Sequence, residues 1–474
     1  MSDKLTLTTL ENAVAGDGVA FRCKVTLQPA AGEGTKVFPP TYAGAVYATE
    51  KRRLPNRAEP VECVLLDSVQ SQANRMEEAL QQAIDEGRLQ LPLIEVDFTK
   101  YYKDGETGDN RLRDPVGKVS SLQVPHRIAD AILRDSTQDG TPFRESEIGK
   151  RINRVSARNA TALFEFCPTA LVFGMWDSTG PKGGLGAKFE RAMVAEIVGI
   201  DAVFGVKTSS RMDPLGIQRG AGPLYRRADG QYTLDPKQAL DEIKDEKPTG
   251  RKVLYKRNSK GVDVFHDPKD VKFADQGRPS EANHGNVTPD IDYRKDQNRI
   301  ILDEDGRPIP VGGVTISHAE QTIVLSLPAL RRLRFPVAGG DGEGPDDKAR
   351  KRREIERDNA ARTVLAALGL CAATLAAENG LDLRSRCLLW PTEPLKWQLL
   401  GRPGQKEEDL VLDSKDAIEI LSSAVKKAKG LGLPWREERE EAVVLQPSDE
   451  LVRLVVKSQN LAAQQGGDAG EGGE

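Results

Sequence analysis

The chain has few aromatic residues and no organised cysteine pattern. Phe, Trp and Tyr make up 5% of its 474 residues, so a sheet lined with exposed base-stacking rings, as in sequence-reading RNA modules, is not expected. The cysteines are odd in number, scattered and free of any Cys-x-x-Cys pair. This pattern excludes a disulfide framework or a zinc knuckle and is typical of a reduced cytoplasmic protein.

Long hydrophobic runs and an excess of positive charge are also missing. The N-terminal MSDKLTLTTLENAVAGDG has no apolar signal core, and we expect no run long enough to span a bilayer. The formal net charge of -4 argues against a protein that coats nucleic acid by bulk charge. Any nucleic-acid surface must therefore be a local basic stripe.

Residue patterns for catalysis are weak. The pair His266-Asp267 invites comparison with metal-dependent phosphohydrolases, but their ligands project from helices, whereas residues 264–268 are typical of a strand running into a turn. There is no Gly-x-Ser-x-Gly elbow, and Cys167 lies in an apolar segment, where an inert core cysteine is expected. We predict no catalytic residue, no metal site and no cofactor.

Strand and helix patterns alternate along the chain. Residues 19–27 and 61–66 are typical of strands, and Asp67-Ser68 caps an amphipathic helix that ends near Gly87. Further expected elements are a helix from Pro125, strands in 162–175, a helix over 187–198, strands in 202–206 and 313–327, helices over 348–378 and 415–429, and a disordered tail from Gln464. With a polar insertion before the return strand, this order predicts an α+β, split βαβ, ferredoxin-like core.

The glycine-rich segment from Gly180 to Gly186 is a candidate phosphate-binding loop. Its glycines and Lys182 would let backbone amides approach an anion closely. It matches neither the nucleoside-triphosphate loop nor the dinucleotide fingerprint, and a flexible connection is the alternative. Asp177, at the preceding strand end, has three open roles: metal ligand, base or turn cap.

Polar and basic side chains gather at the ends of several predicted elements. They lie around Lys51, at the start of the helix after Asp67, in residues 120–127 and in residues 207–211. Each cluster alone is more often a solvated surface, but together they suit a phosphodiester backbone. Because the chain has few aromatic residues, we expect a grip through phosphate and ribose that leaves the base edges free.

These residues resemble one CRISPR family. The segments that carry the resemblance are PPTYAG at 39–44, LDSVQSQANR at 66–75, VPHR at 124–127, NATAL at 159–163, the loop at 180–188 and KTSSRMDPL at 207–215. The chain resembles the Cas-seven-like backbone subunit of type I-G (formerly I-U) Cascade complexes, in the RAMP superfamily. The likeness covers most of residues 5–217, is weaker over 311–440 and is absent from the polar insertion.

The resemblance implies a modified RRM-like palm with large inserted fingers and thumb elements. Residues 1–217 would form the first part of the palm, with a loop insertion near 37–60. Residues 218–312 would be the polar insertion, residues 313–440 would complete the palm with C-terminal helices, and residues 441–474 would be an extension with a disordered tail.

The resemblance also implies a function and a set of partners. Several copies of the subunit would stack along one CRISPR RNA and present it for pairing with a target DNA strand in antiviral defence. The implied partners are copies of itself, a large subunit, a fused end-capping and processing subunit, and a recruited helicase-nuclease. No membrane partner is implied. Two rival functions stay open: a metal-dependent ribonuclease of the RAMP superfamily, using Asp67 or Asp177, and an oligomeric scaffold without nucleic acid.

The predicted RNA-binding residues come from the polar clusters and the glycine loop. They are Lys51, Arg52, Arg53, Ser68, Ser71, Asn74, Arg75, Ser121, Gln123, His126, Arg127, Lys182, Gly183, Gly184, Lys188, Lys207, Ser209, Ser210 and Arg211.

Overall fold

The computed structural model describes the chain except for short gaps. The gaps are residues 1–2, 44–45, 56, 107, 109, 181–186, 256–261, 271–276, 297–298, 303–304, 338–346, 405–406, 437–441 and 467–474. The described chain forms two compact units, one of residues 1–203 and 313–459, and one of residues 204–312 and 460–474. The predicted insertion at 218–312 lies within the second of these units. The division into palm, insertion and extension stays a prediction.

A large mixed sheet organises the first unit. Its strands follow the order β1 (Asp3–Lys4), β29 (Glu408–Val411), β28 (Trp397–Leu400), β2 (Ala20–Pro29), β25 (His318–Ser326), β13 (Met193–Ile200), β6 (Val61–Asp67) and β5 (Thr49–Arg52). The short strands β26 (Leu381–Asp382) and β27 (Leu388–Pro391) join it beside β2. From β28 to β5 each neighbouring pair is antiparallel. The chain is therefore an α+β protein, as predicted, while the RRM-like palm stays a prediction.

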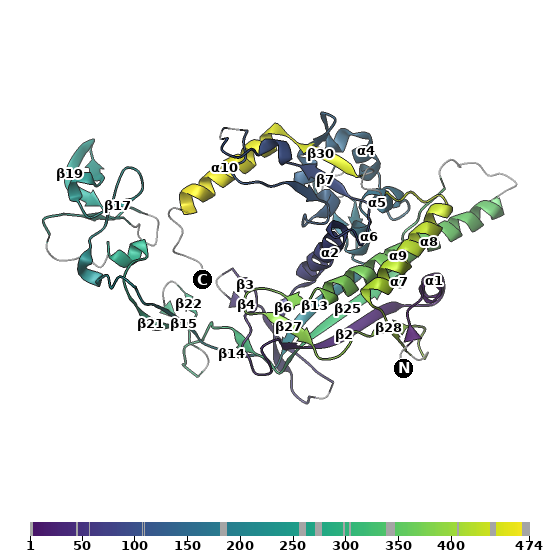
Figure 1. Ribbon diagram of the computed structural model, residues 1–474. Coiled ribbons are helices and arrows are strands. Elements are labelled where there is room, and N and C mark those ends of the chain that lie inside the picture. The colour runs from purple at the N-terminus through teal and green to yellow at the C-terminus, as the bar shows by residue number, and fades with distance from the viewer. Residues whose placement is uncertain are drawn as a thin grey trace. The chain divides into compact units, whose positions relative to one another are not determined.

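Helices cover one face of this sheet (Figure 1). Along β25 every second residue is buried, from Ala319 to Leu325, and the residues between them are partly exposed. A strand with one buried face alternates in this way because successive side chains point to opposite sides. The covering helices of the unit are α1 (Leu7–Ala15), α2 (Val69–Asp85), α7 (Leu327–Arg331), α8 (Asp347–Glu378) and α9 (Ser414–Gly430).

The long helix α8 forms the centre of the core. Its residues from Ala360 to Leu375 are almost all buried, which fits a helix that is apolar on every side. An 18-residue window of this helix has a mean hydropathy of 1.7 and is long and apolar enough to cross a membrane by composition. The expectation that no run reaches this length was wrong. However, 83% of the window is buried inside the protein, as in the core helix of a soluble domain.

A second sheet and several short helices complete the first unit. The sheet has the order β10 (Thr141–Pro142), β9 (Ser136–Gln138), β30 (Val443–Pro447), β7 (Ile94–Asp97) and β8 (Lys118–Ser120). The short helices are α3 (Ala131–Arg134), α4 (Glu147–Asn153), α5 (Thr161–Phe166) and α6 (Thr169–Val172). Helix α10 (Asp449–Gly466) begins in this unit, and its residues from Asn460 onward belong to the second unit. A hairpin of β11 (Met175–Trp176) and β12 (Lys188–Phe189) follows α6.

The second unit consists of small antiparallel sheets. Its strands are β15 (Lys207–Arg211) with β21 (Val287–Asp292), β16 (Tyr225–Arg226) with β17 (Tyr232–Thr233), β18 (Asp241–Lys244) with β19 (Lys247–Val253) and β20 (Phe265–His266), and β22 (Lys295–Asp296) with β23 (Arg299–Ile300). Tyr225, Ala239 and Leu254 form a small buried cluster. Exposed and partly exposed residues predominate elsewhere, as the polar sequence predicted.

Several predicted elements are confirmed and two are wrong. The helices at α2, α8 and α9 and the strands at β2, β6 and β25 match their predicted ranges closely. Residues 162–175, predicted as strands, form α5, α6 and only the first residue of β11. Residues 187–198, predicted as a helix, form β12 and most of β13. The helix predicted from Pro125 is limited to a single turn at residues 127–129 and α3. The predicted disordered tail is helical up to Gly466, and its remainder lies outside the described residues.

All five cysteines are free thiols buried in the protein. Burial raises the pKa of Cys23 and of Cys371 to about 12 and that of Cys387 to about 11. Burial also raises the pKa of Cys167, which lies between α5 and α6 rather than in the predicted strand. These thiols are therefore protonated core side chains at neutral pH.

The burial of α8 predicts how two substitutions on this helix differ. Leu368→Ala removes a side chain that is 0% exposed and should lower the free energy of unfolding by about 2–5 kcal/mol, because it leaves a cavity. Ile355→Ala is the matched control, since Ile355 is 60% exposed on the same helix, and its effect should stay within about 0.5 kcal/mol. Urea unfolding of both variants measures the difference. Equal losses would contradict a buried α8.

Candidate nucleic-acid interface

A groove of about 880 Å³ lies beside the first turns of α2. One side is formed by α2, a second by residues 125–134, and a third by the β11–β12 hairpin with the segment up to Val194. The groove thus joins three of the segments that the sequence singled out, which lie far apart along the chain. Its lining residues are Val69, Gln70, Ala73, Asn74, Pro125, His126, Arg127, Ala129, Ala131, Arg134, Gly174, Met175, Trp176, Ser178, Thr179, Lys188, Phe189, Glu190, Arg191 and Val194.

Three predicted RNA-binding residues meet in this groove with exposed side chains. They are Asn74 from α2, His126 from the second segment and Lys188 from β12. Asn74 lies on the outer face of α2, because its neighbours Ala73 and Met76 point into the core. Each of the three can donate a hydrogen bond to an anionic oxygen. The groove is also close to the positive end of the α2 dipole.

The sequence reasoning missed three residues of the groove: Trp176, Arg134 and Arg191. Lys188 and Arg191 are both exposed, and neither forms an ion pair with another residue in the described part of the chain. By contrast, Arg134 pairs with Asp135, and Glu190 pairs with Arg332. The groove therefore carries two unneutralised cations, which is a local basic surface on a chain of net charge -4.

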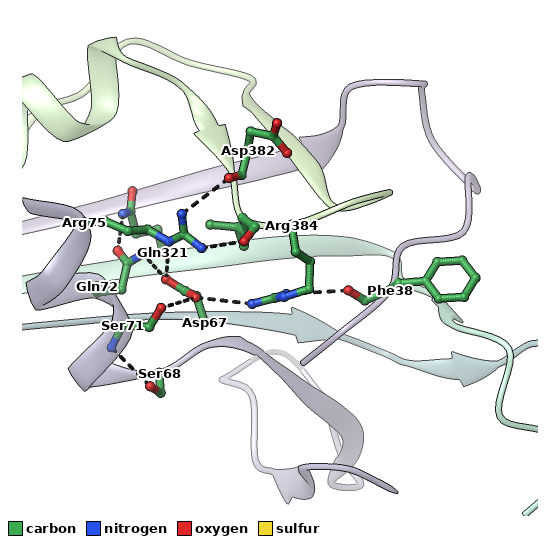
Figure 2. A network of polar contacts seen from close by, with 10 residues as sticks. Phe38, Asp67, Ser68, Ser71, Gln72, Arg75, Gln321, Asp382 and Arg384 are labelled. Carbon is green, nitrogen blue, oxygen red and sulfur yellow. Dashed lines mark hydrogen bonds and ion pairs between the residues drawn. The ribbon is translucent and has the colours of Figure 1, made fainter. Parts of the chain in front are cut away.

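Asp67, at the end of β6, is the centre of a network of polar contacts with residues of α2 and the loop after β26 (Figure 2). Its carboxylate is 1% exposed and accepts hydrogen bonds from Ser71 Oγ at 2.8 Å and Gln72 Nε2 at 2.7 Å. The guanidinium of Arg75 donates to it at 3.0 Å and that of Arg384 at 3.4 Å. A buried carboxylate needs such partners, because burial removes it from water.

This arrangement gives several predicted RNA-binding residues a structural role. Ser68 Oγ accepts from the Ser71 backbone N–H at 3.3 Å and caps α2, as expected of its position. Arg75 also donates to the carbonyl of Leu383 at 2.5 Å, so its side chain links α2 to the loop after β26. Ser68, Ser71 and Arg75 therefore stabilise the fold around the start of α2.

Arg127 is the clearest departure from the predicted set. It is 6% exposed, and its guanidinium binds both carboxylate oxygens of Glu77, at 2.7 and 2.6 Å. It also donates to the carbonyl of Gly174 at 3.1 Å and lies over the ring of Phe173. Burial raises the pKa of the Glu77 carboxyl, and the Arg127 guanidinium opposes that rise. Arg127 is thus committed to a buried ion pair, and we remove it from the proposed phosphate contacts.

Asp177 is held in a second buried ion pair. It is 5% exposed, and Arg144 donates to its two oxygens at 2.5 and 3.0 Å. This bidentate contact fixes the chain directly after β11. Asp177 therefore has a role outside the three left open, since its ion pair with Arg144 anchors the start of the glycine-rich segment.

Other predicted residues of the first unit lie outside the groove. Ser121 is fully buried, and Gln123 is exposed but accepts from the Ser120 backbone N–H at 2.9 Å. Arg52 pairs with Glu50 and Glu196 on the edge strand β5. Lys51 and Arg53 are exposed at the same edge.

The predicted cluster at residues 207–211 belongs to the second unit. Lys207, Ser209 and Ser210 are partly or fully exposed on β15. Arg211 donates to the carbonyls of His284 and Gly285, at 3.1 and 3.0 Å, and so supports a turn of its own unit. Lys182, Gly183 and Gly184, the centre of the predicted phosphate loop, lie outside the described residues.

The candidate metal ligand His266 lies in a short strand of the second unit. His266 is 8% exposed on β20 and its Nδ1 lies 3.1 Å from the Tyr225 hydroxyl. The prediction that His266 ends a strand before a turn is confirmed. Within the described residues, no group of three or more His, Cys, Asp and Glu side chains is placed to hold a metal ion.

The buried pair of Arg127 and Glu77 predicts a loss of stability. Arg127→Ala leaves the Glu77 carboxylate buried without its cation and should lower the free energy of unfolding by about 3–5 kcal/mol. The double variant Glu77→Met/Arg127→Met should recover much of that loss, because it removes both charges. Arg191→Ala, an exposed change in the same groove, is the control and should leave stability within about 0.5 kcal/mol. Thermal unfolding measures all three. An Arg127→Ala protein of normal stability that no longer binds RNA would return Arg127 to the binding set.

The groove lies within the part of the chain that matches a known family. Residues 21–203 match the family model described as CRISPR-associated protein GSU0053. The comparison with curated proteins gave no match. The matched segment includes β2, β6, α2, the β11–β12 hairpin and β13, so it contains every lining residue of the groove. The match supports the predicted Cas backbone subunit, while the type I-G subtype stays a prediction. Over residues 21–203, the chain is therefore similar to this CRISPR-associated GSU0053 family.

Proposed function

We propose that the protein is a non-catalytic, sequence-independent CRISPR RNA-binding backbone subunit of a cytoplasmic type I-G Cascade complex. The groove beside α2 would hold part of the guide RNA by its phosphates and riboses. The observation that carries the proposal is the meeting of Asn74, His126, Lys188 and Arg191 in one groove, within the segment that matches a CRISPR-associated family. Two unpaired cations next to the start of a helix favour binding of a phosphodiester backbone.

The proposal includes the predicted partners. Copies of the subunit would line one CRISPR RNA and leave its base edges free for a target DNA strand, so that pairing rather than protein reads the sequence. The large subunit, the fused end-capping and processing subunit and the recruited helicase-nuclease would complete the system. The match to a CRISPR-associated family supports membership in such an effector complex.

The ribonuclease alternative needs a free carboxylate at the site. Asp67 and Asp177 are both buried and both bound by arginine, which supports the non-catalytic proposal. Incubation of the protein with labelled RNA and Mg²⁺ or Mn²⁺ tests this directly. Cleavage that is lost in a folded Asp67→Asn or Asp177→Asn variant would favour the ribonuclease.

The proposed groove predicts how RNA affinity responds to substitution and salt. Lys188→Ala and Arg191→Ala should each weaken binding of a guide-length single-stranded RNA about tenfold, since one charge-assisted contact contributes roughly 1.5 kcal/mol. Each should also reduce the log–log salt slope by about 0.7, the value for one phosphate contact on a single strand. Fluorescence anisotropy over roughly 50–300 mM salt, which brackets physiological ionic strength, measures the affinity and the salt slope.

A control variant and a second guide sequence complete the test of RNA affinity and salt slope. Lys457→Ala removes an exposed lysine of α10 that does not line the groove, and it should change neither affinity nor slope. Two guides of unrelated sequence should lose affinity equally. A loss of affinity confined to one guide would mean that these side chains read bases. Unchanged RNA binding by both variants would show that the groove is not the RNA site.

The second unit suggests where copies of the chain meet. Met212 is 88% exposed and Leu215 is 74% exposed in the segment after β15, the highest values among the large apolar side chains that the structure describes, which suits a surface covered by a partner. We expect a guide-length RNA to gather several copies by a head-to-tail contact, measured as mass by light scattering. Met212→Asp/Leu215→Asp should reduce the copies per RNA, whereas Lys244→Asp, an exposed change on β18, should not. A one-to-one complex of the unmodified protein at saturation would contradict this assembly.

A further inference from the structure

Trp176 is the one large aromatic side chain among the lining residues that is mostly exposed. It is 60% exposed, whereas Phe189 in the same groove is 7% exposed. Among the other tryptophans, Trp397 and Trp435 are buried, and Trp390, on β27, is 66% exposed outside the groove. A single exposed apolar residue is common on protein surfaces. The surroundings of Trp176 are what distinguish it from Trp390.

The hairpin that carries Trp176 presents it beside a cation. In the β11–β12 register, Met175 pairs with Phe189 and Trp176 pairs with Lys188. Met175 and Phe189 are buried, and Trp176 and Lys188 are exposed, so the latter two share the outer face of the hairpin. Trp176 and Lys188 therefore project from paired positions at the groove wall.

The backbone on both sides of Trp176 is fixed by buried ion pairs. On one side, the carbonyl of Gly174 accepts from Arg127, whose guanidinium is held by Glu77. On the other side, the Asp177 carboxylate is bound by Arg144. A side chain on a backbone held at both ends loses little conformational entropy when a ligand binds it. The two buried arginines thus fix the backbone from which the exposed ring projects.

We propose that Trp176 is a stacking platform for one nucleobase of the bound single strand, while Lys188 and Arg191 contact neighbouring phosphates. This inference rests on the proposed function, since it assumes that the groove holds RNA. Stacking accepts every base, because each has a π-face, so such a platform is compatible with binding that is independent of sequence. It changes the expected mode of grip, from phosphate and ribose alone to phosphate, ribose and one stacked base per groove.

The first experiment separates stacking from charge. Trp176→Ala in the full chain should weaken binding of a guide-length single-stranded RNA by about 5- to 150-fold, the fold-change that corresponds to 1–3 kcal/mol for one stacked base. The log–log salt slope should stay unchanged, because no phosphate contact is lost. Trp176→Phe should retain most of the affinity, and Trp390→Ala, the equally exposed control, should have no effect.

The second experiment removes the bases instead of the ring. A ribose–phosphate strand without bases should bind the unmodified protein more weakly than RNA, and Trp176→Ala should remove most of that difference. In the Trp390→Ala background, where Trp176 is the remaining exposed tryptophan, RNA should quench the tryptophan emission and the baseless strand should quench it less.

The outcomes distinguish this inference from the proposed function. If Trp176→Ala binds RNA normally while Lys188→Ala and Arg191→Ala bind it weakly, the stacking inference is wrong and the groove is retained. If Trp176→Ala weakens RNA and the baseless strand equally, the ring shapes the groove without stacking, and the inference is again wrong. If none of the three variants changes RNA affinity, the proposed function itself fails.

Discussion

The buried carboxylate of Asp67 is the constraint on which the region around the groove depends. A charge taken out of water must be matched by donors, and here they come from α2 and from the loop after β26. Meeting that demand ties β6 to α2 and directs Arg75 inward. Once this face of α2 is fixed against the sheet, Gln70 and Asn74 are left on the other face, where they line the groove. The buried charge of Asp67 thus determines which side chains of α2 face the groove.

Much of the fold was predictable where one face of an element is polar. The spacing in α2 and the caps at its ends identified that helix. The Ala- and Leu-rich sequence of α8 identified it as a helix, but not as the core helix. Residues 161–172 were misread because nearly all of them are buried, so their pattern has no polar face to reveal its period. In β13 the apolar residues Met193 and Ile197 fit a helical spacing, yet Ala195 between them is also buried, which is the spacing of a strand.

The site was predictable only in part, because sequence does not reveal which arginines have buried partners. Asn74, His126 and Lys188 were found from polar clusters at element ends, where side chains do face solvent. Arg127 has the same local pattern, but its partner Glu77 comes from α2, in another cluster of the chain. Trp176 was overlooked because a low aromatic content argues against many stacking residues and says nothing about a single one.

The buried thiols have a consequence for how motions of this protein can be followed. Five cysteines are distributed over β2, β6, the α5–α6 junction, α8 and the loop before β27, and all are enclosed. Since only an exposed thiolate reacts quickly, each cysteine becomes modifiable when its own part of the structure opens. The rate at which an alkylating reagent labels each position therefore measures the opening of that part. The five cysteines can therefore report local unfolding at five positions. Comparing their labelling rates with and without RNA would show whether bound RNA reduces that unfolding.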